Sequence, residues 1–172
     1  MSAATKWSRS EWPLRRVSLP AGISGRLWLT EMPGRSTLLS DFLSVARELG
    51  ITGVVCLVPP ENITHSAPDY AAARSVGLED MQLLDCPIPD YGLPPDTIAF
   101  QAFIGDLANR LRQGERLVIH CAAGVGRTGM AAVVLMRALG LSPADALATV
   151  WAAGSRPETP EQMKFAMEHA DA

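Results

Sequence analysis

Runs of hydrophobic residues alternate with segments of mixed polarity along the chain, and they predict strands that alternate with helices. Continuous apolar or β-branched runs are typical of buried strands, whereas apolar residues spaced three or four apart are typical of amphipathic helices. We expect strands within residues 25–30, 51–58, 78–88 and 116–121. We expect helices over residues 38–49, 67–77, 96–113 and 128–139, and two more that begin at Ser142-Pro143 and Thr159-Pro160.

This alternation predicts an α/β fold with a single, mainly parallel central sheet that is flanked by helices on both faces. The segment 87–95 interrupts it, because four prolines and one glycine in nine residues exclude regular structure. Residues 1–22, which include Trp7 and Trp12, have mixed polarity and predict an N-terminal arm packed on the domain. We expect the domain itself to span residues 23–172.

Composition and charge narrow the class of protein. The chain has 172 residues, of which 48% are hydrophobic and 19% charged, as in ordinary soluble globular domains. The net charge of −3 argues against a nucleic-acid or membrane-surface partner. No C-x-x-C pair or histidine spacing suggests a metal site, so we expect neither metal nor cofactor. The first residues lack the apolar core of a signal peptide, and we expect a cytoplasmic monomer.

The ten residues HCAAGVGRTG (120–129) carry the strongest motif, and they fit two patterns. The first is the G-x-G-x-x-G loop of dinucleotide-binding folds. Such a loop needs a following strand and an acidic residue about twenty positions on. Asp145 lies at about that distance but within a predicted helix, and the residues after Gly129 predict helices only. The strand and the acidic residue that a dinucleotide-binding loop requires are therefore not predicted here, which argues against that interpretation.

The second pattern is a cysteine followed by five residues, Arg127 and Thr128. The strand over 116–121 delivers Cys121 to the carboxyl end of the sheet, where sites of α/β proteins form. The small residues that follow let backbone amides turn toward an anion, beside the amino end of a helix. Arg127 adds a planar fork for two phosphate oxygens, and a thiol in such surroundings ionises readily. The alternative, a buried structural cysteine, does not account for this arginine and these glycines.

HCAAGVGRTG resembles the phosphate-binding loop of the cysteine-dependent tyrosine and dual-specificity phosphatases, and PIPDYGLPPD (87–96) looks like their mobile general-acid loop. The likeness covers roughly residues 25–170. It is greatest to the kinase-associated phosphatase (cyclin-dependent kinase inhibitor 3-like) group, in which a cysteine-bearing strand such as VVCLVPPE also precedes the acid loop.

This resemblance implies a dual-specificity phosphatase-like fold and a catalytic cycle through a phosphocysteine. Cys121 would be the nucleophile, and Asp90 would be the general acid, with Asp85 and Asp96 as weaker alternatives. Thr128 would hydrogen-bond the sulfur. The expected phosphate-binding residues are Ala122, Ala123, Gly124, Val125, Gly126 and Arg127.

Other residues are expected to support the same site. We expect His120 to orient the loop through backbone hydrogen bonds, and Gly92 to act as a hinge for loop closure. The segment SRPETPEQ (155–162) resembles the water-positioning segment of the superfamily. Gln162 matches its later glutamine, whereas Glu158 stands where larger tyrosine phosphatases have a glutamine. Ordinary polar roles at a helix start explain both residues equally well.

A further cysteine raises a redox hypothesis. Cys56 lies in the strand 51–58, which we expect to neighbour the strand that carries Cys121. A nearby thiol could trap an oxidised Cys121 as a disulfide, provided that the Cα atoms come within about 7 Å. Cys86 is the second possible partner, and an inert core cysteine is the alternative for Cys56.

The expected substrate is a phosphoprotein that carries phosphotyrosine, with phosphoserine and phosphothreonine also possible. The loop AAGVG has no lysine, which argues against highly charged phosphoinositides or polyphosphates. We expect phosphate-like oxyanions to bind in the same place. The alternatives are a catalytically weak phosphate-binding module, a phosphatase for a non-protein phosphoester, and rhodanese- or arsenate-reductase-like thiol chemistry, which would not need Asp90.

Overall fold

The computed structural model describes residues 11–169, in which five strands form one sheet in the order β1-β2-β5-β3-β4. β1 pairs with β2 in antiparallel fashion, and the other neighbouring strands are parallel. The strands are β1 (Arg15–Val17), β2 (Arg26–Thr30), β3 (Gly53–Cys56), β4 (Gln82–Asp85) and β5 (Arg116–His120).

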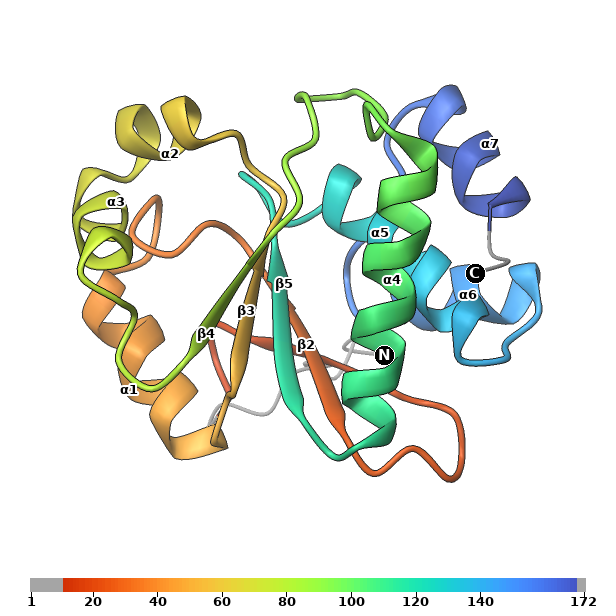
Figure 1. The fold of residues 1–172 in the computed structure, drawn as a ribbon, viewed down its shortest axis with the longest axis horizontal. Helices are drawn as coiled ribbons and strands as arrows, with labels where there is room; N and C mark the ends of the chain where they lie inside the picture. The colour runs from red at the N-terminus through yellow and green to blue at the C-terminus, as the bar shows by residue number, and fades with distance from the viewer. Residues whose placement is uncertain (1–10, 170–172) are drawn as a thin grey trace, which may run out of the picture.

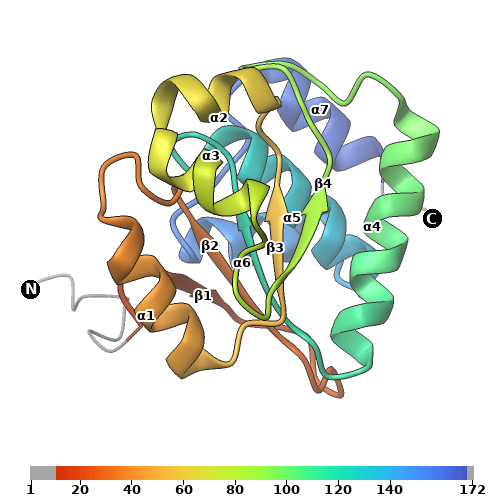
Figure 2. The same ribbon diagram turned by 60° about the vertical axis from the view of Figure 1, so that its left-hand side comes forward.

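Helices cover both faces of this sheet. Figures 1 and 2 show α1, α2 and α3 on one face and α4, α5, α6 and α7 on the other. The helices are α1 (Leu39–Leu49), α2 (Pro60–Ser66), α3 (Pro68–Ser75), α4 (Thr97–Arg112), α5 (Gly126–Ala138), α6 (Pro143–Ala152) and α7 (Pro160–Glu168). The predicted α/β fold with a mainly parallel sheet is confirmed.

The expected strands and helices all occur, with shifted bounds, and segment 87–95 is irregular as predicted. Two elements were not predicted. The first is α2, which begins at Pro60, where the missing N–H of proline costs nothing. β1 lies inside the segment expected to be an arm, and it extends the sheet by pairing with β2. Trp7 lies outside the described residues.

The helix α5 is the centre of the larger helical layer. Every residue from Gly126 to Met136 is buried, because α5 contacts β5 on one side and α4, α6 and α7 on the others. A helix that is apolar on all sides is typical of such a position. This packing holds the amino end of α5 in place beside the carboxyl end of β5.

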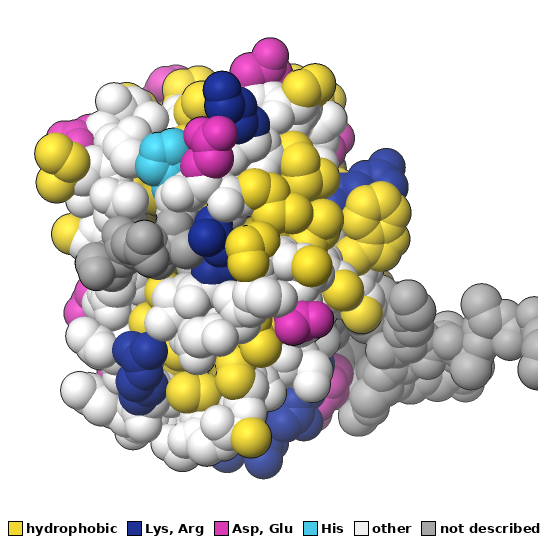
Figure 3. Space-filling view, turned by 90° about the vertical axis from the view of Figure 1, so that its right-hand side faces the viewer, with side chains coloured by type: hydrophobic (Ala, Val, Ile, Leu, Met, Phe, Trp, Pro, Cys, Tyr) yellow, Lys and Arg dark blue, Asp and Glu magenta, His cyan; other side chains and the backbone are white. Residues whose placement is uncertain are grey.

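Part of the surface over α6 and α7 is apolar (Figure 3). Figure 3 shows hydrophobic side chains gathered on this face, with positive and negative groups scattered among them rather than collected into a field of one sign. Trp151 of α6 is half exposed, and the Arg156 guanidinium lies 4.9 Å from the centre of its ring. None of the helices within residues 11–169 is long and apolar enough to cross a membrane.

Candidate active site

The loop between β5 and α5 carries the predicted nucleophile. β5 ends at His120, so Cys121 is the first residue beyond the carboxyl end of a central strand. The Ala122 carbonyl accepts a hydrogen bond from the Met32 amide at 2.9 Å, which ties the loop to the end of β2. Gly124 has φ +73°, and an added Cβ would collide with the Thr30 carbonyl. Only glycine suits this position.

A cavity of about 140 Å³ opens above this loop. It brings together most of the residues predicted for the site, although Gly124, Thr128 and Cys56 are not among those that line it. Two further residues, Arg35 and Tyr91, were not predicted. The lining residues are Arg35, Asp90, Tyr91, Cys121, Ala122, Ala123, Val125, Gly126, Arg127, Glu158 and Gln162.

Arg127 links the phosphate-binding loop to the predicted acid loop. Its guanidinium is buried, with 3% of the residue exposed, and Nη1 donates to the Ile88 carbonyl at 3.0 Å. Nη2 lies 3.2 Å from Oδ1 of Asp90. The carboxylate of Asp90 is 60% exposed and therefore stands at the mouth of the cavity, above the buried Cys121. A carboxyl group so placed can reach an oxygen of a bound phosphoester.

The two other aspartates considered for the acid role have structural partners instead. Asp85 makes a bidentate ion pair with Arg74, with both distances at 2.8 Å. Asp96 caps α4 by accepting a hydrogen bond from the Ala99 amide at 3.0 Å. Neither residue lines the cavity.

Thr128 lies in the first turn of α5 and is fully buried. Within residues 11–169 its hydroxyl Oγ1 has no hydrogen-bond partner. An unpaired buried hydroxyl is costly, so buried polar groups in native proteins nearly always have a partner. The hydroxyl is therefore available to a group on the reaction side of the loop.

His120 contacts the backbone carbonyl of Cys121, the predicted nucleophile. Its Nδ1 lies 3.0 Å from the Cys121 carbonyl oxygen and its Nε2 lies 2.8 Å from the Tyr70 hydroxyl. A carbonyl only accepts, so Nδ1 carries the proton and Nε2 accepts from Tyr70. Burial lowers the pKa of His120 to about 4, so the ring is neutral at pH 7. Arg74 extends this chain, since its Nη1 donates to the Tyr70 hydroxyl at 3.4 Å.

The acid loop is joined to α7 by Gln162. The Gln162 side chain donates from Nε2 to the Gly92 carbonyl at 3.1 Å, and its Oε1 accepts from the amides of Glu158 and Thr159. Both ends of this buried amide group are therefore engaged. The loop also holds Tyr91 at a positive φ of 56°, next to the acid.

Glu158 is a second acidic residue that lines the cavity, besides Asp90. A Cβ added at Gly126 would lie 2.5 Å from Oε1 of Glu158, so the carboxylate packs directly on the start of α5. The residue is exposed, and its carboxylate makes no hydrogen bond or ion pair with other described residues. Among residues 11–169 there is no cluster of three or more His, Cys, Asp or Glu side chains that could hold a metal ion.

Sequence patterns offered little signal for the two residues that were missed. Arg35 lies in the turn after β2, where its amide donates to the Met32 carbonyl at 3.1 Å. Tyr91 directly follows the predicted acid, and its side chain is 64% exposed. Tyr91 could have been predicted to line the site because it is next to Asp90 in the sequence. Arg35 is far from the other site residues in the sequence, and only the folded structure places it at the cavity.

Comparisons with known proteins identify the family of this chain. The family model described as "PTP-SAK: Swiss Army Knife protein, DSP-PTPase phosphatase domain" matches residues 28–171. The human tyrosine-protein phosphatase non-receptor type 4 is 44% identical over 43 residues, which are 24% of this chain and 5% of that protein. The chain thus spans a small part of this much longer relative.

Two solved structures share the fold. A crystal structure of kinase associated phosphatase, with its catalytic cysteine replaced by serine, superposes with a TM-score of 0.77 at 19% identity, over 90% of this chain and 92% of that one. The active form of Tk-PTP has a TM-score of 0.68 and 29% identity, over 92% and 97% of the two chains. The fold therefore agrees with the predicted resemblance.

Proposed function

The chain belongs to the DSP-PTPase phosphatase family, and from this premise we propose that it hydrolyses phosphate monoesters of proteins through a phosphocysteine on Cys121. One observation carries the proposal. The thiol of Cys121 and the guanidinium of Arg127 line one cavity, and Asp90 is ion-paired to that guanidinium at the mouth. Nucleophile, anion clamp and proton donor are thus within reach of one bound phosphoryl group.

In the first step, the Cys121 thiolate attacks phosphorus in line with the leaving oxygen. The S–P bond forms as the P–O bond breaks, and Asp90 gives its proton to the leaving oxygen. Arg127 holds two phosphoryl oxygens and stabilises the charge of the transition state, together with amides of residues 122–126. The buried hydroxyl of Thr128 donates to the sulfur, which accounts for its having no other partner among the described residues.

In the second step, water attacks phosphorus and the S–P bond breaks, returning the electron pair to Cys121. Asp90, now ionised, accepts a proton from this water. Glu158 and Gln162 were both candidates for holding the water. We favour Glu158, because its carboxylate faces the cavity without a partner in the described chain, whereas the amide of Gln162 is engaged at both ends.

The substrate that we propose is phosphotyrosine in a phosphoprotein. The exposed Tyr91 ring beside the mouth suits an aromatic leaving group, and Arg35 at the rim suits an acidic neighbour in the substrate. Phosphoserine and phosphothreonine are second candidates. A binding module without turnover is the alternative from a different class, and the placement of Asp90 argues against it.

The deciding experiment is turnover of p-nitrophenyl phosphate by the wild type and by Cys121→Ser. We expect the wild type to hydrolyse it in the presence of a chelator and to be inhibited by vanadate. The Cys121→Ser variant should lose turnover and still bind phosphate, because Arg127 and the loop amides remain. Full activity in this variant, or loss of wild-type activity with the chelator, would contradict the mechanism. Phosphate binding with no wild-type turnover would instead support the binding module.

A further inference from the structure

Arg15 of the antiparallel edge strand β1 reaches the back of the phosphate-binding loop. Its Nη2 donates to the Gly124 carbonyl at 2.6 Å, and its Nη1 donates to the Ala153 carbonyl at 2.7 Å and to Ser155 Oγ at 3.0 Å. One guanidinium therefore joins β1, the loop after β5 and the turn after α6. The Ser155 hydroxyl also donates to the Gly124 carbonyl, at 2.6 Å.

These contacts fix the direction of a peptide group within the loop. Two donors hold the carbonyl of Gly124, a residue that does not line the cavity. Since neighbouring amides in an anion-binding loop must turn toward the anion, carbonyls such as this one need partners elsewhere. The guanidinium supplies such a partner as a charge-assisted donor, which is stronger than a neutral one.

The charge of Arg15 also acts on the site. Burial lowers the pKa of Arg15, while the nearby negative charges of Cys121 and Glu31 oppose that shift. An arginine stays protonated even so. A positive charge therefore lies against the carbonyl of Gly124, outside the cavity, and favours an anionic phosphoryl group bound on the loop.

We propose that Arg15 is a positioning residue for phosphate binding and phosphoryl transfer. This inference rests on the proposed function for its role in turnover, although its effect on anion binding can be measured separately. Arg15 lies within residues 1–22, which the sequence predicted to be only an arm packed on the domain.

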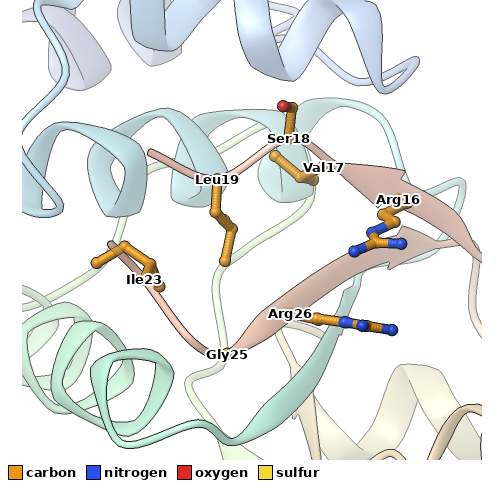
Figure 4. Close-up of a pocket in the computed structure, with 7 residues that line it drawn as sticks. All are labelled: Arg16, Val17, Ser18, Leu19, Ile23, Gly25 and Arg26. Carbon is orange, nitrogen blue, oxygen red and sulfur yellow. The ribbon is translucent and has the colours of Figure 1, made fainter. Parts of the chain in front are cut away.

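The neighbouring Arg16 is a matched control on the same strand. Alternation along β1 places it on the opposite face from Arg15. Figure 4 shows Arg16 with Arg26 at a separate cavity of about 420 Å³, which Val17, Leu19 and Ile23 also line. Its side chain is 48% exposed, and its nearest acidic partner, Glu11, lies 3.9 Å away. Among residues 11–169 it makes no hydrogen bond or ion pair with the phosphate-binding loop.

The test compares Arg15→Met, Arg15→Lys and Arg16→Met by kcat/KM for an aryl phosphate and by the dissociation constant for vanadate. We expect Arg15→Met to lose about 30- to 100-fold in kcat/KM and to bind vanadate about tenfold more weakly, because small misplacements of a site cost that much. Arg15→Lys should recover part of both, since lysine keeps the charge without the planar fork. Arg16→Met should stay within about twofold of the wild type.

Thermal denaturation checks that each variant folds. If Arg15→Met does not fold, Ser155→Ala is used with Arg15→Lys instead, because it removes the second donor to the Gly124 carbonyl. We then expect Ser155→Ala and Arg15→Lys to weaken vanadate binding in proportion to kcat/KM. Values for the folded Arg15 variants equal to those of Arg16→Met would overturn the proposal. If the wild type binds vanadate but has no turnover, the proposed function fails, and the vanadate constants alone decide the role of Arg15.

Discussion

At the scale of single residues, Asp90 differs from Asp85 and Asp96 because its ion-pair partner lines the cavity. Its carboxylate pairs with Arg127 across the cavity mouth and accepts a hydrogen bond from the next amide, that of Tyr91. Asp85 and Asp96, in contrast, are occupied by an ion pair and a helix cap. An acid that must give and take a proton needs this proximity to the cavity.

We predict that Asp90→Asn lowers kcat/KM for phenyl phosphate by about 10²–10⁴, the usual contribution of general acid catalysis. The loss should be smaller for p-nitrophenyl phosphate, whose leaving group needs little protonation. The fall in rate at high pH should disappear, since the acid works only while it is protonated. Rates over a pH series with both substrates provide the measurement.

Asp96→Asn is the matched control, because asparagine caps a helix as well as aspartate does. This variant should keep wild-type rates and stability. An unchanged pH profile in Asp90→Asn would assign the acid role to another residue.

At the scale of elements, strand register decides what can meet Cys121. β3 pairs with β5 so that Cys56 lies opposite His120, one residue before Cys121. Cys56 is buried and donates to the Val58 carbonyl at 3.7 Å. Burial raises its pKa to about 11, which leaves roughly one thiolate in 10⁴ at pH 7. A role in trapping oxidised Cys121 therefore stays a prediction, and it has a marked pH dependence.

If Cys56 is the trap, its thiolate attacks the sulfenic acid of Cys121 and releases hydroxide as the disulfide forms. The yield of disulfide after mild peroxide should then rise steeply between pH 7 and 9, as the thiolate fraction of Cys56 grows. Mapping of disulfides and recovery of activity with reductant are the measurements. Recovery of Cys56→Ser as complete as that of the wild type would reject a protective role, and Cys86→Ser tests the other possible partner.

Elements with strong local signals could be predicted from the sequence. The run LVIH in β5 and most of the apolar helix α5 are buried, so their local sequences are enough to predict a strand and a helix. β1 has only three residues, of which two are arginines. It forms a strand because its backbone pairs with the edge of β2. Such pairing is a tertiary effect that no local pattern reveals.

The same distinction applies to the site. Cys121, Arg127 and Thr128 lie within eight consecutive positions, and the chemistry of that motif can be inferred from it. Arg15 and Arg35 reach the site from distant segments, so only the fold identifies them. The hydrogen bond from the Gln162 side-chain amide to the Gly92 carbonyl could not be predicted either, because the two residues are seventy positions apart.

At the scale of the whole molecule, the site is assembled from nearly the full length of the described chain. β1, the turn after β2, the acid loop, the loop after β5 and the turn before α7 all contribute. Behind them, the hydrogen bonds of Tyr70 and His120 link α3 to the backbone carbonyl of Cys121. Changes that protonate this buried pair should therefore destabilise the entire fold.

We predict that the free energy of unfolding falls as pH decreases from about 6.5 to 4, in part through His120. The unfolded histidine binds a proton near its ordinary pKa of 6.5, whereas burial keeps the folded one neutral down to about 4. The unfolded state thus holds more protons in this window, and stability declines as pH falls, by up to roughly 3 kcal/mol from this group. Above pH 6.5 the group contributes no slope.

Denaturant unfolding at pH 7 and pH 4.5 measures this effect in the wild type and in His120→Asn. The asparagine amide can still donate to the Cys121 carbonyl but cannot titrate, so its stability should be lower at pH 7 and fall less on acidification. His65→Asn is the control, since His65 is exposed to solvent on α2 and should leave the difference between the two pH values unchanged. Equal losses in the wild type and His120→Asn would show that other groups, such as carboxylates in ion pairs, account for the acid sensitivity.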